Sequence, residues 1–194
     1  MPKNFFSVLN NLASNAAPRL LGSFLERSLN GHTIVVRIVE TEAYDQTDIA
    51  SHSYRGQTPR TKIMFGEAGF LYVYFTYGMH YCCNIVVGQP GNGSAVLLRA
   101  VEPLKGEAFM KLQRRGVSGK ELTNGPAKLC QAMAIDKSLN GHDLQKKPLR
   151  LIIKNEVPSN VIVQTTRIGI REGKKAPWRF YIKDNPFVSK LWIK

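Results

Sequence analysis

The sequence predicts a mixed α/β fold of the α+β type, built as one domain on an antiparallel or irregular sheet. Its 194 residues, of which 43% are hydrophobic, suffice for one sizeable core and are few for two domains. Segments rich in β-branched and aromatic residues mix with helical patterns, without the regular alternation of a parallel βαβ fold. Because neither repeats nor low-complexity stretches divide the chain, residues 1–194 are expected to form a single domain.

One helix and several strands are predicted in the first half of the chain. Residues 1–15 are expected to form a loosely ordered N-terminal segment. Leucine and phenylalanine side chains at helical spacing predict a helix over about Ala16–Leu29, and Asn30-Gly31 ends it. β-branched residues predict a strand over His32–Tyr44, followed by a polar loop that runs to Arg60. Further strands are predicted at Gly69–Thr76, Tyr81–Val87 and Ser94–Val101.

The second half of the chain is predicted to begin with helices and to end with strands. Gly106–Gly119 is a basic segment whose start is expected to be helical. Asn124-Gly125-Pro126 opens a second helix that runs to Ile135, because proline is tolerated at the first helical position. Strands are predicted at Leu149–Ile153, Gln164–Ile170 and Arg179–Ile182, with a basic loop, Arg171–Pro177, between the last two.

Charge is the most unusual property of the composition. The 27 Lys and Arg residues against 14 Asp and Glu give a net charge of +13, which favours a polyanionic partner, either nucleic acid or an anionic membrane surface. No segment reaches the roughly 18 consecutive apolar residues of a membrane span, and the N-terminus lacks a signal-peptide pattern. The three cysteines have no disulfide-framework spacing. We therefore expect reduced thiols and a protein that is not secreted, located in the cytoplasm or nucleoid of a bacterium or in the nucleus of a eukaryote.

Two carboxylates lie on one face of the strand predicted at His32–Tyr44. The even positions begin as an apolar face and continue with Glu40, Glu42 and Tyr44. A glutamate at the end of a core face has two explanations. It forms a salt bridge to one of the many basic residues, or it is a partly desolvated carboxylate that serves in catalysis. The strand alone leaves both explanations open.

An aromatic hairpin is predicted over residues 69–84. Tyr77-Gly78-Met79-His80 forms its turn, because Gly78 permits the backbone that a turn demands. An exposed tip that carries Tyr77 and Met79 suits a wedge between base pairs, which is a known means of distorting a duplex. The competing interpretation places these aromatic side chains in the core. The net charge favours the wedge.

Several basic residues are candidate phosphate contacts. Those singled out are Arg55, Arg60 and Lys128, together with the backbone amide of Gly125 at the predicted helix start. The four histidines and three cysteines fit no metal-ligand spacing, so no metal site is expected. The sequence also lacks the glycine-rich phosphate loops and the Gly-x-Ser-x-Gly elbow.

Characteristic motifs extend over most of the chain. They include Arg37-Ile-Val-Glu-Thr-Glu-Ala-Tyr44, Tyr77-Gly-Met79, Val96-Leu-Leu-Arg99, Gly125-Pro-Ala-Lys-Leu-Cys-Gln-Ala132, Arg167-Ile-Gly169 and Trp178-Arg-Phe-Tyr181. Together they resemble the alkyladenine (3-methyladenine) DNA glycosylase family of the mammalian type. The resemblance implies a single mixed α/β domain with a curved antiparallel sheet, surrounding helices and a protruding β-hairpin.

The resemblance implies a catalytic pair. Glu42 corresponds to the carboxylate that activates a water for attack on C1′ of the damaged nucleotide, and Arg99 to a basic residue beside that water. Alkylation makes a purine a good leaving group, so a positioned water and one carboxylate suffice and no cofactor is expected. No lysine stands out as a Schiff-base nucleophile, and no lyase step is expected.

The resemblance also implies a pocket for the flipped base. Tyr44, His52 and Tyr74 correspond to the walls that stack on the base. Tyr77 corresponds to the side chain that fills the gap left in the duplex. Asn84 corresponds to the residue that discourages undamaged guanine by colliding with its 2-amino group. An aromatic pocket favours a cationic base through cation–π attraction.

The resemblance thus predicts a monofunctional DNA glycosylase that initiates base excision repair. It would flip alkylated or deaminated purines, of the 3-methyladenine, hypoxanthine and ethenoadenine class, out of double-stranded DNA and hydrolyse their N-glycosidic bond as a monomer. One alternative is a non-catalytic protein that binds damaged DNA and uses Glu42 only as a salt-bridge partner. Another is a basic RNA-binding or ribosome-associated protein, against which the missing RNP pattern weighs.

Overall fold

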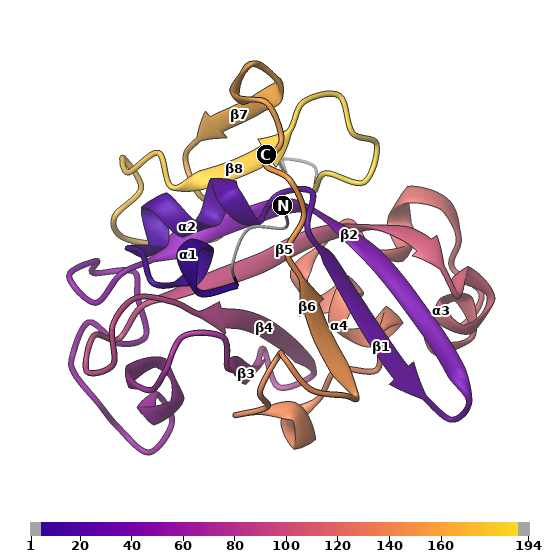
Figure 1. Cartoon of the computed structure of the whole chain (residues 1–194), viewed down its shortest axis with the longest axis horizontal. Helices are drawn as coiled ribbons and strands as arrows, with labels where there is room; N and C mark the ends of the chain where they lie inside the picture. The colour runs from indigo at the N-terminus through magenta and orange to yellow at the C-terminus, as the bar shows by residue number, and fades with distance from the viewer. Residues whose placement is uncertain (1–4, 190–194) are drawn as a thin grey trace.

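Strand β2 (His32–Tyr44) organises the sheet of this protein, whose computed structural model describes residues 5–189 (Figure 1). Along one edge β2 pairs with β5 (Ala95–Lys105). Along its other edge β2 pairs first with β1 (Phe24–Leu29) and then, at Glu40–Glu42, with β8 (Arg179–Ile182). The second half of β2, which carries the two glutamates, therefore lies between β5 and β8.

The described residues form one eight-stranded sheet whose pairings are antiparallel. The order is β3-β4-β5-β2-β1-β6, while β8 joins the second half of β2 and β7 pairs with β8. The strands not yet introduced are β3 (Leu71–Thr76), β4 (His80–Val86), β6 (Leu149–Ile152) and β7 (Ile162–Thr165). Helices surround this curved sheet, so the predicted mixed α/β class is confirmed (Figure 1).

Short helices pack against the sheet. The helices α1 (Phe5–Leu9) and α2 (Ala13–Leu20) lie beside each other, and α2 contacts β2 and β8 (Figure 1). After β5 the chain forms α3 (Glu107–Gln113) and then α4 (Pro126–Ala132), which packs on β4 and β5. Single 3₁₀ turns occur at Lys62–Phe65, Gly119–Leu122, Lys137–Leu139 and Ser159–Val161. Within residues 5–189, no helix has the length and apolar character needed to cross a membrane.

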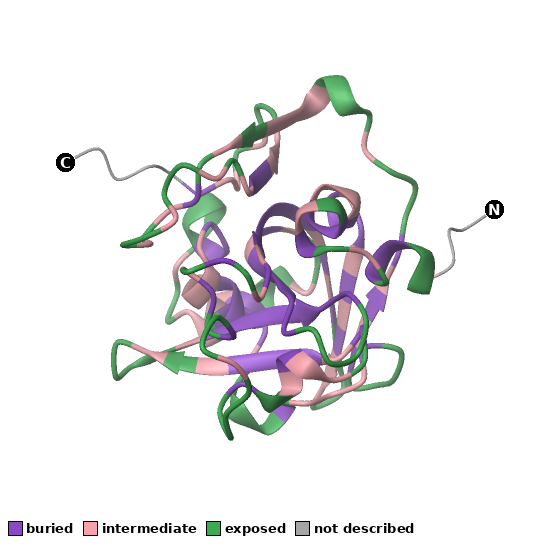
Figure 2. Cartoon of the chain, turned by 90° about the vertical axis from the view of Figure 1, so that its left-hand side faces the viewer, coloured by how far each residue is buried: buried purple, intermediate pink, exposed green. Residues whose placement is uncertain are grey.

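The hydrophobic core lies between the sheet and these helices. It contains Ala13 and Leu20 of α2, Ile38 of β2, Leu98 of β5 and Met133 after α4, all of them fully buried. In Figure 2 the buried residues gather in the middle of the molecule along the central strands, and the exposed residues lie on the outer loops. The core thus supports one face of the central strands, and side chains on the other face are available to form a site.

The predicted helix over Ala16–Leu29 is wrong in its second half. The helix α2 ends at Leu20, and Phe24–Leu29 forms strand β1. Asn30 and Gly31 have positive φ angles of 49° and 77° and form the turn between β1 and β2. Asn-Gly is the favoured dipeptide for such a hairpin turn. The pairing of β1 with both β2 and β6 therefore outweighs the helical spacing of its apolar residues.

The N-terminal segment is more ordered than expected. Within residues 1–15, α1 and the start of α2 are regular helix. Val8 and Leu9 are fully buried and belong to the core. Residues 1–4 lie outside the described residues.

The strand predicted over Gln164–Ile170 is largely wrong, because the observed strand β7 is Ile162–Thr165 and shares only Gln164 and Thr165 with it. Strand β7 ends at Thr165, and the chain then leaves the sheet through a loop in which Gly169 has a φ angle of 78°. The side chain of Arg167 turns inward and is fully buried, which ends the strand and anchors this loop. The loop forms part of the wall of the cavity described below.

β-Bulges on β2 and β5 lie next to the predicted site. In the pairing of these two strands, Val39 on β2 and Arg99 on β5 have no partner on the opposite strand. A bulge shifts the alternation of side chains by one position. Before the bulge the even-numbered Ile38 enters the core, and after it the odd-numbered Ala43 does so. The even-numbered Glu42 therefore points away from the core, which corrects the expectation that the carboxylates share the core face.

Candidate active site

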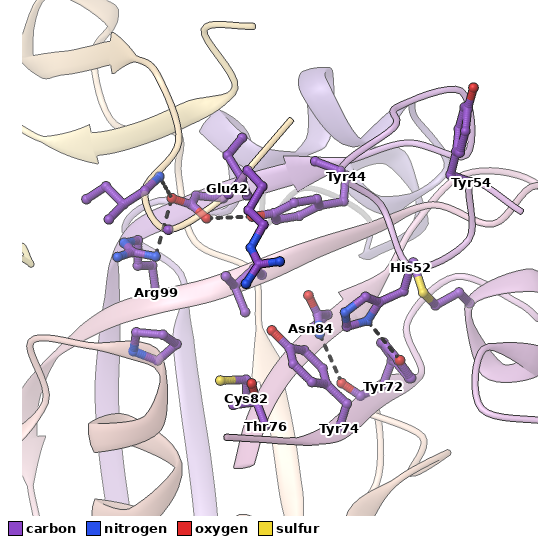
Figure 3. Close-up of a pocket in the computed structure, with 18 of the residues that line it drawn as sticks. Glu42, Tyr44, His52, Tyr54, Tyr72, Tyr74, Thr76, Cys82, Asn84 and Arg99 are labelled. Carbon is purple, nitrogen blue, oxygen red and sulfur yellow. Dashed lines mark hydrogen bonds and ion pairs between the residues drawn. The ribbon is translucent and has the colours of Figure 1, made fainter. Parts of the chain in front are cut away.

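A cavity of about 650 Å³ opens beside the second half of β2 (Figure 3). Its walls come from β2, β3, β4 and β5 and from the loops at residues 49–55 and 168–172. The volume is typical of small-molecule sites. Of the residues predicted for the site, the structure brings together in this cavity Glu42, Tyr44, His52, Arg55, Tyr74, Tyr77, Asn84 and Arg99.

Glu42 lies at one end of the cavity and is fully buried (Figure 3). Its Oε1 accepts a hydrogen bond from the backbone N–H of Ile168 (2.8 Å), and its Oε2 accepts one from the Tyr44 hydroxyl (2.8 Å). Burial, followed by the nearby Glu42 carboxylate, raises the pKa of Tyr44 well above 10.0, so Tyr44 stays protonated and donates. Each carboxylate oxygen has two lone pairs, so these bonds orient Glu42 and leave acceptor positions for a further ligand.

Glu40, two positions earlier, is occupied by partners inside the protein. It is fully buried and accepts hydrogen bonds from Arg179 Nε (2.6 Å), from the backbone N–H of Ser189 (2.7 Å) and from the Ser189 hydroxyl (2.9 Å). The two explanations that the sequence leaves open therefore apply to different residues. Glu40 is the internal salt-bridge partner, and Glu42 faces the cavity.

Arg99 lies between the two glutamates. Its Nε is 3.3 Å from Glu40 Oε1 and donates a hydrogen bond to Ser189 Oγ (3.0 Å). Its Nη1 is 3.4 Å from Glu42 Oε1. The end of the cavity thus holds a carboxylate with a guanidinium beside it.

Aromatic rings form the wall across from Glu42 (Figure 3). His52 meets Tyr74 edge to face with ring centroids 4.6 Å apart, and Tyr72 stacks on Tyr74 at 5.7 Å. His52 Nδ1 lies 3.1 Å from the Tyr72 hydroxyl, and Asn84 donates its amide to the backbone oxygen of Tyr72 (3.3 Å). Arg60, a candidate phosphate contact, lies behind this wall with its Cζ 5.8 Å from the Tyr74 ring centroid.

The ionisation of His52 is altered by this wall. Desolvation against the neighbouring rings, followed by the charge of Arg60, lowers the pKa of His52 from 6.5 to about 4. Part of the side chain remains exposed on the cavity side, yet the imidazole is neutral at physiological pH. The wall therefore carries no charge from this residue.

The lowered pKa of His52 predicts a pH-dependent stability. The unfolded chain binds a proton at His52 near pH 6.5, and the folded protein binds one only near pH 4. The free energy of unfolding therefore falls as the pH is lowered through this interval. We expect His52→Asn to lose less stability than wild type between about pH 7 and about pH 5, measured by urea unfolding. His80→Asn, at the exposed hairpin tip, is the control, and equal losses in wild type and the His52 variant would contradict the prediction.

The hairpin of β3 and β4 carries the predicted wedge. Tyr77 is 83% exposed and Met79 is 69% exposed. Tyr77 and Gly78 have positive φ angles of 51° and 67°, a backbone conformation that is uncommon for tyrosine. Tyr77 borders the cavity, whereas Met79 lies outside its lining. The turn therefore presents Tyr77 at the mouth of the cavity and Met79 farther out.

The other candidate phosphate contacts lie at different places. Arg55 is exposed and lines the cavity, and Gly125 adjoins Pro126, which lines it as well. Lys128 is bound within the protein, because its Nζ donates to Asn124 Oδ1 (2.7 Å). Of these residues, Arg55 is the one whose charge is presented at the cavity itself.

A buried ion pair that no sequence spacing predicts holds one wall of the cavity. Arg167 forms a two-pronged pair with Asp48 (Nη2 to Oδ1, 3.0 Å) and donates to the backbone oxygen of Ala43 (2.9 Å). Its Cζ lies 4.6 Å from the centroid of the Tyr44 ring. The next residue, Ile168, provides the N–H that binds Glu42. Arg167 thus fixes the loop that orients the carboxylate, and its only sign in the sequence is the Arg-Ile-Gly motif.

Comparison with known proteins identifies the family. The family model described as methylpurine-DNA glycosylase (MPG) matches residues 7–186. A protein of Carboxydothermus hydrogenoformans named "Putative 3-methyladenine DNA glycosylase" is 55% identical over 175 residues, which cover 90% of this chain and 92% of the relative. A protein of the same name from Francisella tularensis is 46% identical over 190 residues, which cover 96% of this chain and 98% of the relative. Another from Desulfitobacterium hafniense is 46% identical over 186 residues, which cover 89% of this chain and 91% of the relative. The resemblance that the motifs indicate is confirmed, and the chain belongs to the methylpurine-DNA glycosylase family.

Proposed function

We propose that this protein is a monofunctional DNA glycosylase that hydrolyses the N-glycosidic bond of alkylated or deaminated purines in double-stranded DNA, as a monomer. Membership of the family supports DNA glycosylase activity in general, and the lesions and the residue roles are our proposal. The observation that carries it is a fully buried glutamate, Glu42, facing a cavity with aromatic walls. A base inside a duplex must leave the stack to reach such a carboxylate.

In this proposal Glu42 is the general base. A water bound to its free acceptor positions attacks C1′ and transfers a proton to the carboxylate. The bond between C1′ and the purine nitrogen breaks, and its electron pair goes to the base. An alkylated purine such as 3-methyladenine is cationic in DNA, so it leaves as a neutral molecule and needs no acid. Because the nucleophile is water, the reaction ends at an abasic site without strand cleavage.

The walls of the cavity suit a flat, cationic base. Tyr44 and Tyr74 are phenols whose ring faces attract a cation. His52 adds a third ring without charge repulsion, because its pKa of about 4 keeps it neutral. Asn84 is 5% exposed and donates its amide to the backbone oxygen of Tyr72, and in this proposal its side chain collides with the 2-amino group of guanine. These features together favour alkylated adenine over undamaged guanine.

Base release from defined duplexes tests the proposal. Duplexes carrying 3-methyladenine, hypoxanthine, ethenoadenine or only normal purines are incubated with the protein, and free base is measured. We expect release from the damaged duplexes and fastest release of the cationic base. Binding of damaged duplexes without any release would instead support the non-catalytic damage binder. If the protein shows no binding and no release with any of these duplexes, the proposal is overturned.

Removal of the proposed wedge gives a further prediction. Tyr77→Ala is expected to weaken binding to a damaged duplex by about 5-fold to 150-fold, because the stacking of one aromatic side chain on a base contributes about 1–3 kcal/mol. The side chain is 83% exposed, so the fold is expected to be unaffected. Affinity is measured by fluorescence anisotropy. Leu112→Ala removes another exposed apolar side chain, outside the cavity, and is expected to bind as wild type. Equal affinity of the Tyr77 variant and wild type would contradict the role of Tyr77.

A further inference from the structure

Glu40 is a fully buried carboxylate that takes no direct part in the proposed reaction. We propose that Glu40 is a positioning residue that shares the Arg99 guanidinium with Glu42 and so keeps Glu42 free to accept a proton from water. This inference rests on the proposed function and adds to it a residue that does not touch the substrate.

The guanidinium of Arg99 is anchored by Ser189, whose hydroxyl also binds Glu40. Its Nε donates to Ser189 Oγ (3.0 Å) and lies 3.3 Å from Glu40 Oε1, and the Ser189 hydroxyl in turn donates to Glu40 (2.9 Å). On the other side, Arg99 Nη1 stays 3.4 Å from Glu42 Oε1. A strong charge-assisted hydrogen bond measures about 2.7–2.9 Å. Arg99 is therefore held by its hydrogen bond to Ser189, which is itself bound to Glu40, and it forms a loose ion pair with each glutamate, at 3.3 Å from Glu40 and 3.4 Å from Glu42.

This arrangement leaves lone pairs of Glu42 available to a water. If Arg99 formed a two-pronged pair with Glu42, it would occupy lone pairs that a water needs. A cation in direct contact also lowers the pKa of a carboxylate, by about 1–3 units for an aspartate beside an arginine. The local charge is balanced, because the two carboxylates of Glu40 and Glu42 face the two guanidiniums of Arg99 and Arg179. Removal of the Glu40 charge leaves Glu42 as the only carboxylate available to Arg99 in this cluster.

The other titratable groups around Glu42 have partners of their own. Arg179 is held by Glu40 and by the backbone oxygen of Ser189 (3.2 Å). Arg167, in the loop after β7, is paired with Asp48. The groups that face Glu42 are Tyr44 on β2, Tyr74 on β3, Arg99 on β5, Arg167 and, through Glu40, Arg179 on β8. Of these, Arg99 is the cation that contacts both carboxylates directly. Glu40 can therefore influence Glu42 through the position of Arg99.

The test is the pH dependence of base release by Glu40→Gln. The single-turnover rate is measured at saturating protein on a duplex with 3-methyladenine, since a permanently cationic base makes the acid limb of the profile report on the protein. We expect the acid limb to move to lower pH by about one unit or more, and the plateau rate to fall by about 10-fold or more. A variant with reduced thermal stability and an unchanged acid limb would show that Glu40 is merely structural, and would overturn the proposal.

A second variant and two controls keep the result decisive. Ser189→Ala retains the backbone N–H on Glu40 and removes the hydroxyl that tethers Arg99, so we expect a smaller shift in the same direction. If Glu40→Gln does not fold, an unchanged acid limb in Ser189→Ala overturns the proposal. Glu26→Gln breaks an ion pair to Arg150 between β1 and β6 and is expected to leave the profile unchanged.

The control Glu42→Gln distinguishes a failure of the proposed function from a failure of the positioning role of Glu40. If Glu42→Gln releases base at the wild-type rate, the proposed function of Glu42 fails, and the role of Glu40 fails with it. If Glu42→Gln is inactive and the acid limb of Glu40→Gln matches wild type, only the positioning role of Glu40 is overturned.

Discussion

Replacement of Glu42 by Gln is expected to lower the single-turnover rate of base release by about 10²-fold to 10⁴-fold, which is the usual contribution of a positioned general base. The amide has the shape of the carboxylate. Its oxygen can still accept from the N–H of Ile168, and its NH₂ can donate to the Tyr44 hydroxyl, which then serves as an acceptor. The geometry of the cavity is therefore expected to survive while the ability to take a proton from water is lost.

Affinity for damaged DNA distinguishes this loss from a loss of structure. We expect Glu42→Gln to bind a damaged duplex at least as tightly as wild type, because the cavity walls and the hairpin tip are unchanged. Binding is measured by fluorescence anisotropy and fold by thermal denaturation, with Glu26→Gln as the matched substitution outside the cavity. Wild-type base release by Glu42→Gln would remove Glu42 from the mechanism.

Replacement of Arg167 by Met is expected to lower the free energy of unfolding by about 3–5 kcal/mol, the usual cost of removing one partner of a buried ion pair. Arg167 is 0% exposed at its side chain and Asp48 is 4% exposed, so the substitution leaves a buried carboxylate without its cation. The double variant Asp48→Asn/Arg167→Met removes both charges and is expected to regain most of the lost stability. Urea unfolding of wild type, the single variant and the double variant measures both effects.

The exposed pair of Lys146 and Asp143 provides the control for this prediction. Lys146 is 75% exposed at its side chain, and its pair to Asp143 is 3.1 Å long. Surface pairs of this kind contribute about 0–1 kcal/mol, so Lys146→Met is expected to change stability little. If Arg167→Met costs no more than Lys146→Met, the buried pair is not a major source of stability. Base release by Arg167→Met is also expected to fall, because Arg167 fixes the loop whose Ile168 N–H orients Glu42.

The strands that form the site could be predicted from the sequence because their composition is typical of strands. His32–Tyr44 is rich in β-branched residues and is observed as β2 with the same bounds. Phe24–Leu29 could not be assigned correctly, because its apolar residues fit a helical spacing and only the pairing with β2 and β6 makes it a strand. Local sequence does not contain those long-range contacts.

The cavity was predictable where its residues are close in sequence or carry the family motifs. Glu42 and Tyr44 are two positions apart, so strand periodicity places both on one face. The bulge that turns this face away from the core has no chemical signature, because Val39 is an ordinary strand residue. Arg167 and Asp48 lie 119 positions apart, so no local pattern joins them. A contact of that kind becomes visible only once the chain is folded.

The bulges at Val39 and Arg99 have a consequence for how this chain tolerates insertions and deletions. Deletion of Thr41, which follows the bulge and faces the core, would move Glu42 into the core-facing position and leave Ala43 at the cavity. β5 shares the register of β2, so a length change in one strand requires a matching change in the other. We therefore expect length changes to be tolerated in the loops, whereas a residue lost from β2 requires the loss of a residue from β5 as well. A chain can retain every functional residue and still lose the site through the loss of one residue that has no chemical role.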